Sequence, residues 1–351
     1  MNQIQAPSGE ADIAAPAHKS ASWSARLAPF REPDTRRSVW QLASTAGLFA
    51  INWALMYFAL DLGYWVTLLL AVPAAFLQVR LFIFQHDCGH GAFFKSSRAA
   101  DAVGSVLGVL TLTPYHYWKR THAMHHATSG NLEHRGFGDI DTLTVDEYLR
   151  LSRWGRFKYR MYRHPLTLFV FGPALHFLIK HRLPTIVPSN WSRERRSILW
   201  TNVGLAAFIT TMAYVVGLKA FLLVHLPLAL IACSVGVWLF YVQHQFEPTY
   251  WEHDEGWKFD AAALEGSSYY ALPRVLQWFT GNIGLHHVHH LNSRIPNYRL
   301  QKVYETFPEL QRVTRLTLWQ SIRCVPLALW DERARRLVPF PRGRARAAGA
   351  A

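Results

Sequence analysis

The stretch Gly284-Leu285-His286-His287-Val288-His289-His290 places four histidines within five consecutive positions. Packing does not require this arrangement, because histidine is only moderately buried in folded proteins and its ring carries two polar nitrogens that need partners. Neutral imidazole is also the commonest protein ligand for transition metals. Taken by itself the stretch could be a solvated histidine patch, so its meaning depends on whether the pattern recurs elsewhere in the chain.

Two further histidine clusters lie upstream of this stretch. The segment His122-Ala123-Met124-His125-His126 has the spacing H-x-x-H-H, which the first stretch repeats, and His86-Asp87-Cys88-Gly89-His90 supplies a pair at i and i+4. Residues at i, i+3 and i+4 share one face of a helix, so we expect each cluster to aim its rings at a single point. Together the clusters predict a metal site with eight histidine ligands: His86, His90, His122, His125, His126, His286, His289 and His290.

The size of this ligand set constrains the number of metals more than their identity. A zinc ion takes about four protein ligands, so eight imidazoles predict two metals or one metal with redundant ligands. Nitrogen ligands suit iron, copper, zinc and nickel, and the choice among them stays open at this point. The three cysteines, Cys88, Cys233 and Cys324, are too few and too separated for a disulfide framework, which fits a reducing, cytosol-facing location.

Long apolar runs decide the fold class. Half of the 351 residues are hydrophobic. Four runs, at about 39–60, 64–84, 198–218 and 220–242, approach the length of about twenty residues that a membrane-spanning helix needs. Short connections join these runs in pairs. A polypeptide backbone crosses the hydrocarbon core of a bilayer only as helices or closed barrels, in which its polar groups are hydrogen-bonded. The sequence therefore predicts an all-α integral membrane protein with four transmembrane helices in two hairpins.

Basic residues predict the orientation of this fold. They flank the outer ends of both hairpins, so the amino terminus, the carboxyl terminus and all three histidine clusters are expected on the cytoplasmic side. A bacterial inner membrane is the expected location. The shorter apolar runs at 103–112 and 165–179 are predicted to lie at the interface and not to cross.

The predicted domain organisation has three parts. Residues 1–37 are expected to form a disordered cytoplasmic arm, and residues 321–351 a basic tail. Residues 38–320 form the membrane domain, whose cytoplasmic cap (85–197 and 243–320) holds the metal site. The formal net charge of +14 predicts contact with anionic lipid and with an acidic electron donor. Nucleic-acid binding does not suit a chain with four spans.

The three clusters resemble the histidine boxes of membrane-bound fatty acid desaturases, in particular the acyl-lipid delta-12 or omega-6 group. The resemblance covers about residues 40–310 and includes the segments 86–90, 121–130 and 281–292. It implies a non-haem diiron centre that uses O2 and two electrons to form a cis double bond. It also implies a fatty acyl substrate carried on lipid, coenzyme A or acyl carrier protein, and an external donor of ferredoxin or cytochrome b5 type.

The same resemblance extends the set of site residues. It implies a ninth histidine ligand, for which His244 matches in location, whereas His287 would point away from the other histidines of its helix. Asn282 resembles a position that helps to hold a metal-bound water. No catalytic residue beyond the ligands is implied. Five carboxylates could orient imidazoles, of which Asp87 and Glu247 are preferred over Glu133, Asp139 and Asp141.

Two other functions fit the same motifs. A lipid or carotenoid hydroxylase or ketolase would use the same scaffold and ligands. A histidine-rich membrane protein that binds or transports metal is a different class, but its ligands would be expected along a path through the membrane. Here the clusters lie outside the predicted spans, which favours an enzyme.

Overall fold

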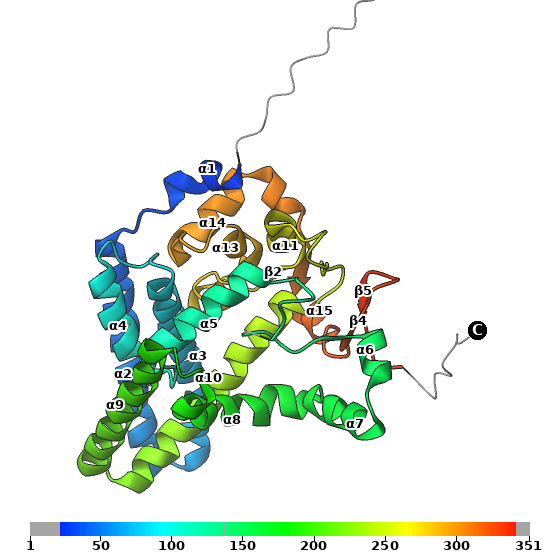
Figure 1. Cartoon of the computed structure of the whole chain (residues 1–351). Coiled ribbons are helices and arrows are strands. Elements are labelled where there is room, and N and C mark those ends of the chain that lie inside the picture. Colours follow the sequence, from blue (N-terminus) through cyan, green and yellow to red (C-terminus); the bar gives the residue numbers. More distant parts are fainter. Residues whose placement is uncertain (1–21, 137, 342–351) are drawn as a thin grey trace, which may run out of the picture.

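The computed structural model describes residues 22–136 and 138–341 of the chain. Four long helices in two hairpins form its framework, and each is long and apolar enough to cross a membrane. They are α2 (Thr35–Phe58), α3 (Tyr64–Gly89), α9 (Ser192–Val216) and α10 (Leu218–His244). The predicted runs fall within these helices or within three residues of their ends, so the expected class, a helical fold with four spans, is confirmed (Figure 1).

Local signals explain where these helices begin and end. The Asp34 side chain caps α2 by accepting a hydrogen bond from the Arg37 N–H at 3.1 Å. Gly63 and Gly217 separate the helices of the two hairpins, with φ of 131° and 85°. Residues other than glycine rarely adopt such backbone angles, so these two glycines allow the tight turns.

The four long helices are unequally buried, and α3 is the central one. Of its most apolar window 56% is buried, against 11% of that of α9. Helix α3 packs against α2, α10 and the short helix α4 (Ser97–Leu110). By contrast, α9 exposes large side chains such as Trp200, Tyr214 and Val215. An apolar surface of this kind suits lipid and not water.

The two shorter apolar runs form helices that are too short to cross. The first lies in α4, and the second forms the π-helical turn η3 (Thr167–Phe171) and α8 (Gly172–Leu178). The preceding helix α7 (Arg153–Tyr162) and α8 follow one another across the direction of the long helices (Figure 1). This arrangement is the one expected for segments at a membrane surface.

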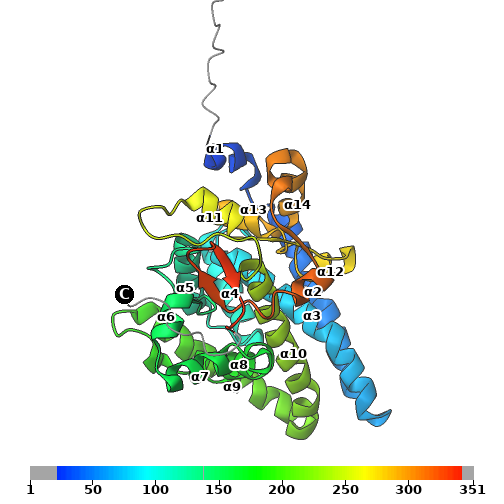
Figure 2. The same cartoon turned by 90° about the vertical axis from the view of Figure 1, so that its right-hand side faces the viewer.

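A cap of short elements covers the end of the bundle at which α3 and α10 terminate (Figures 1 and 2). Within the described residues, five strands of two or three residues supplement the predicted helices. The strands β1 (Leu143–Thr144), β4 (Leu329–Asp331) and β5 (Arg336–Val338) form one sheet, and β2 (Tyr269–Ala271) pairs in parallel with β3 (Arg315–Thr317). The helices of the cap are α5 (Tyr115–Thr128), α6 (Val145–Arg150), α11 (Phe259–Glu265), α12 (Arg274–Phe279), α13 (His286–Leu291), α14 (Asn297–Thr306) and α15 (Leu318–Ile322).

The predicted disordered arm is wrong for residues 22–37, whose last three residues already belong to α2. Helix α1 (Trp23–Leu27) packs on the cap: Leu27 is fully buried, and the Trp23 ring lies 5.9 Å from that of Phe307, edge to face. Arg26 also pairs with Glu309 at 2.5 Å. A short apolar face among polar residues is enough to dock this segment, whereas composition alone suggests disorder. The rest of the predicted arm, residues 1–21, lies outside the described residues.

The carboxyl-terminal boundary at residue 320 is also wrong. Helix α15 runs through it, and the following strands β4 and β5 bury Leu329, Trp330 and Leu337. Leu329 pairs with Leu143 in β1. The predicted tail therefore contributes to the cap up to the last described residue, because short strands gain their stability from distant partners.

Candidate metal centre

Histidine side chains from four segments converge where the cap meets α3 and α10. Their nitrogens form two groups, and within each group one nitrogen per ring lies within 4.8 Å of all the others. The first group comprises His86, His90, His122, His126 and His289. The second group comprises His125, His244, His286 and His290. All nine histidines of the predicted ligand set are therefore brought together, and His287 is not among them.

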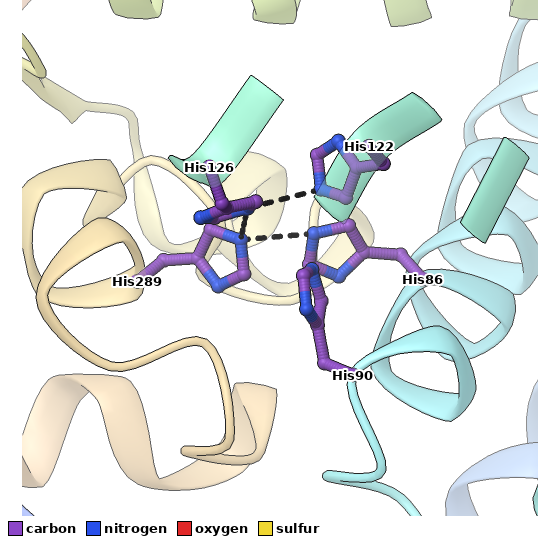
Figure 3. Close-up of side chains that lie close together, drawn as sticks. All are labelled: His86, His90, His122, His126 and His289. Atoms are coloured by element: carbon purple, nitrogen blue, oxygen red, sulfur yellow. Dashed lines mark hydrogen bonds between the residues drawn. The ribbon is translucent and has the colours of Figure 1, made fainter. Parts of the chain in front are cut away.

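The rings of the first group come from the end of α3, from α5 and from α13, and they face one another (Figure 3). The Nε2 atom of His289 lies 3.1 Å from that of His86 and 3.0 Å from that of His126. The Nε2 atom of His90 is buried without a hydrogen-bond partner in the described part of the chain. Such orphaned polar atoms are rare, and a metal ion would satisfy this one.

The second group joins α5, α10 and α13. The Nε2 atom of His244 lies 3.1 Å from that of His125 and 2.9 Å from that of His286. All four side chains are buried. Phe240, one helical turn before His244, packs against the His125 ring with centroids 5.0 Å apart. This apolar contact limits the freedom of the ring and keeps water from it.

Each H-x-x-H-H box is divided between the two groups, which contradicts the expectation that a box aims at one point. His122 and His126 belong to the first group and His125 to the second. The later box does the reverse, because His289 joins the first group. At 3.6 residues per turn, positions i+3 and i+4 lie about 100° apart on either side of i. The two boxes thus exchange their central histidines, and the two groups become neighbours.

Hydrogen bonds at Nδ1 orient three of the rings. His86 donates to Asp87 at 3.1 Å, and His125 donates to Asp139 at 2.5 Å. His244 donates to the carbonyl oxygen of Gly266 at 3.1 Å. A proton held at Nδ1 leaves the lone pair at Nε2, which is the atom that faces the other rings of each group.

Of the two preferred carboxylates, only Asp87 lies beside a histidine ring. Its second oxygen accepts two hydrogen bonds of 2.8 Å from Asn297, one from the backbone and one from the side chain. The carboxylate is therefore held from both sides. Asp139, which the sequence analysis placed after Asp87 and Glu247, orients the His125 ring. Its separation from His125, fourteen residues along a loop, leaves no local pattern by which to select it.

The expectation for Glu247 is wrong. Its carboxylate accepts a hydrogen bond from the Leu337 N–H in β5 and contacts no imidazole nitrogen among the described hydrogen bonds. Helix α10 ends at His244, so the helical face that carries this histidine does not extend to residue 247. Glu247 instead connects the end of α10 to the carboxyl-terminal sheet.

Asn282 and His287 both lie beside the centre. Asn282 precedes the start of α13 and has a φ of 57°, and its Nδ2 points to the Asn297 carbonyl oxygen at 3.4 Å. Since Asn297 also holds Asp87, Asn282 is linked to the first group through two residues. His287 is buried on the opposite side of α13, where its ring lies 5.9 Å from that of Tyr304.

Burial keeps six of the histidines neutral. It lowers the pKa of six imidazoles well below their usual value near 6.5, and neighbouring rings lower each pKa further: His90, His122, His126, His286, His289 and His290. Neutral rings offer lone pairs to a metal. Two groups of four and five nitrogens, without a cysteine, suit two transition-metal ions with imidazole ligands.

A small cavity borders the second group. Its volume is about 10 Å³, and residues such as Asp139, Phe240 and His244 line it. This space is close to the minimum for one water molecule. The cavity therefore suits a molecule of that size beside His244, and it has no room for a long chain.

Four potential membrane helices, with two groups of buried or half-buried histidines at one end, define a membrane protein built around a histidine-rich metal centre. The model of the fatty acid desaturase family matches residues 62–321, and the chain belongs to this family. It is therefore an enzyme of lipid metabolism, as the resemblance of its histidine boxes indicated.

Two relatives illustrate the range of similarity. The chain is 45% identical over 324 residues to a fatty acid desaturase from Bacillus subtilis, with 92% of each chain covered. It is 26% identical to an sn-1 acyl-lipid omega-3 desaturase (ferredoxin) from Synechocystis, with 83% of this chain and 81% of the relative covered. The similarity thus extends across nearly the whole described fold.

Proposed function

We propose that this chain is an acyl-lipid desaturase that introduces a cis double bond at the delta-12 (omega-6) position of a monounsaturated acyl chain. The observation that carries the proposal is the assembly of nine buried or half-buried histidines into two adjacent groups at the end of a membrane bundle. The Synechocystis relative, named as an acyl-lipid desaturase, supports the substrate class. The delta-12 position rests on the resemblance of the three boxes.

The nine histidines would hold two iron ions, one in each group. This assignment is supported by the donor set and by the orphaned Nε2 of His90. Two bound irons would supply, with O2 and two electrons, the oxidising power needed at an unactivated methylene, which side chains lack. The electrons would come from an external ferredoxin-type or cytochrome b5-type protein.

The chain's own residues prepare the site. Asp87 and Asp139 accept the Nδ1 protons of His86 and His125, so both rings present a lone pair toward their group. The Trp118 ring stacks on that of His122 at 4.5 Å and fixes its plane. Because the second group is fully buried, bulk water is kept from the place where chemistry occurs.

We further propose that the centre and both termini face the cytoplasm of a bacterial cell, with the spans in the inner membrane. Arg193, Arg195 and Arg196 lie near the start of α9, and by the positive-inside rule such residues favour the cytoplasmic side. Basic residues of the cap would also attract an acidic electron donor.

The test is expression in a host whose lipids are mainly saturated and monounsaturated, followed by mass spectrometry of fatty-acid methyl esters derivatised to locate double bonds. A diene with the new bond at delta-12 supports the proposal. A double bond elsewhere overturns the position and retains desaturation. A hydroxylated product, or zinc in place of iron in the purified protein, overturns desaturation itself.

A further inference from the structure

Outside the metal centre, the half-buried side chain of Arg182 has few partners among the described residues. Arg182 ends the short turn η4 (Lys180–Arg182) between α8 and α9. Its Nη2 donates to the Leu112 carbonyl oxygen at 2.6 Å, but its Nε and Nη1 are buried without an acceptor in the described part of the chain. Among the described residues no carboxylate lies within ion-pair distance, although burial lowers the pKa of Arg182 only to about 10, so it remains charged.

Another enclosed arginine shows what a structural role looks like. Arg163 donates from Nη1 and Nη2 to the carbonyl oxygens of Asp141 and Leu327 and to the side chain of Gln245. It therefore connects three segments of the cap. Among the described residues Arg163 leaves only its Nε buried without an acceptor, whereas Arg182 leaves both Nε and Nη1, and burying unpaired charged donors is costly. This contrast indicates that a partner of Arg182 is missing from the described part of the chain.

The surroundings of Arg182 are fixed in place before any ligand binds. The Leu112 carbonyl also accepts from Nδ1 of the buried His181 at 3.3 Å, and Leu112 has a φ of 59°. Such an angle is strained for a branched side chain, so surrounding contacts must impose it. On the other side, Asn202 of α9 donates to the Arg182 backbone carbonyl at 2.8 Å.

The segment that contains Arg182 exposes apolar side chains, and its contact with Leu112 connects it to residues next to the metal centre. On the same segment, Leu183 and Ile186 expose large apolar side chains of the kind that contact acyl chains. Toward the centre, Thr111 and Thr113 flank Leu112 and bind Gln85, which precedes His86, at 2.5 and 3.1 Å. A molecule held at Arg182 is therefore anchored next to the turn that supports the first group.

We propose that Arg182 binds the anionic phosphate of the glycerolipid whose acyl chain is the substrate. The inference rests on the proposed desaturase activity and narrows its substrate class to a phospholipid. A phosphodiester offers several acceptor oxygens to the guanidinium fork, whereas an ester or thioester carbonyl offers one. Phosphate is also the abundant oxyanion of a membrane surface.

The experiment measures binding, so it does not depend on turnover. The purified, iron-loaded full chain is delipidated in a neutral detergent, and its melting temperature is recorded with four additives. These are phosphatidylglycerol, diacylglycerol with the same acyl chains, inorganic phosphate and oleate. A ligand that binds only the folded state raises the melting temperature. We expect a rise with phosphatidylglycerol that the other three additives do not produce at equal concentration.

Variants locate the effect. Arg182→Gln is expected to weaken phosphatidylglycerol binding at least ten-fold, and Arg182→Lys, which keeps the charge without the fork, to weaken it less. Lys180→Gln is the matched control, because it removes an exposed cation from the same turn, and it should bind as the parent does.

Four results would overturn the inference. Equal stabilisation by diacylglycerol would show that only the acyl chains bind, and equal stabilisation by inorganic phosphate would show a site for a free anion. Equal stabilisation by oleate would show a carboxylate site, and unchanged binding by Arg182→Gln would remove the arginine. If Arg182→Gln does not fold, the comparison of additives on the parent chain still decides. A chain that binds phospholipid but makes no double bond would instead contradict the proposed function.

Discussion

The two histidine groups use the same ligand chemistry but are supported in different ways. In the first group the orienting carboxylate, Asp87, is the sequence neighbour of His86, and three of its five members are partly exposed. In the second group every histidine is buried, and its orienting acceptors, Asp139 and Gly266, lie 14 and 22 residues from the rings that they hold. The first group is thus organised mainly by helices, and the second depends on loops of the cap.

The largest effects are expected from removing one ligand of each group. His125→Ala and His289→Ala should each abolish double-bond formation and leave at most one iron per chain. His125 is the one histidine of its box that joins the second group, and His289 is the one histidine of its box that joins the first. Methyl-ester analysis and metal analysis of the membrane-inserted protein measure both quantities. His287→Ala is the matched control in the same helix and should retain both irons. Retention of most turnover by either ligand variant would disprove the ligand assignment.

A smaller effect is expected from the carboxylate that only the second group uses. Asp139→Asn removes the acceptor of the His125 Nδ1 proton and should lower metal affinity or activity roughly 10- to 100-fold, as is typical of such partners. Metal titration of the purified apoprotein, read as the loss of one of two binding steps, measures this change. Asp141→Asn, two residues along the same loop, is the control, since the Asp141 side chain contacts no histidine among the described ion pairs. Equal losses in both variants would make the effect a general loosening of the loop.

The smallest effect concerns how the loops around the second group are held. His253 contacts Glu133 at 2.5 Å and Glu332 at 3.0 Å, so it joins three segments of the cap, and Asp254, His134, Glu252 and Arg335 lie beside it. Glu133 and then Glu332 raise the pKa of His253 above its usual value near 6.5. This contribution to stability is therefore complete below about pH 6.5 and is lost as the pH rises through the raised pKa.

Melting temperatures measured from pH 6 to pH 8.5 test this contact. Because the side chains are exposed, the decline across this range should be small, about 2 °C or less, and His253→Gln should lack it. A decline of equal size in His253→Gln would assign the pH dependence to other groups.

Local sequence was sufficient for the parts of this protein that depend on composition and spacing. Uncharged runs of about twenty residues specify spanning helices, because a bilayer requires that length and that internal hydrogen bonding. The first turn falls at Gly63 as predicted, whereas the second falls at Gly217, two residues before Lys219, the position that the predicted runs leave between them. The spacing of the histidine boxes likewise identified eight members of the centre, because histidines are rarely clustered in this way for any reason other than metal binding.

Only the tertiary structure decided which histidines join which group and which residues orient them. Spacing places His122 and His125 on one helix, but the crossing of α5 with α10 and α13 sends them to different groups. The tertiary structure also brings Asp139 to His125 by way of a loop and turns Glu247 away at the end of α10. It likewise docks α1 beside Phe307, just after α14. The physical reason is range: helix geometry fixes the direction of a side chain within a few residues, whereas the point at which distant side chains meet depends on how whole elements pack.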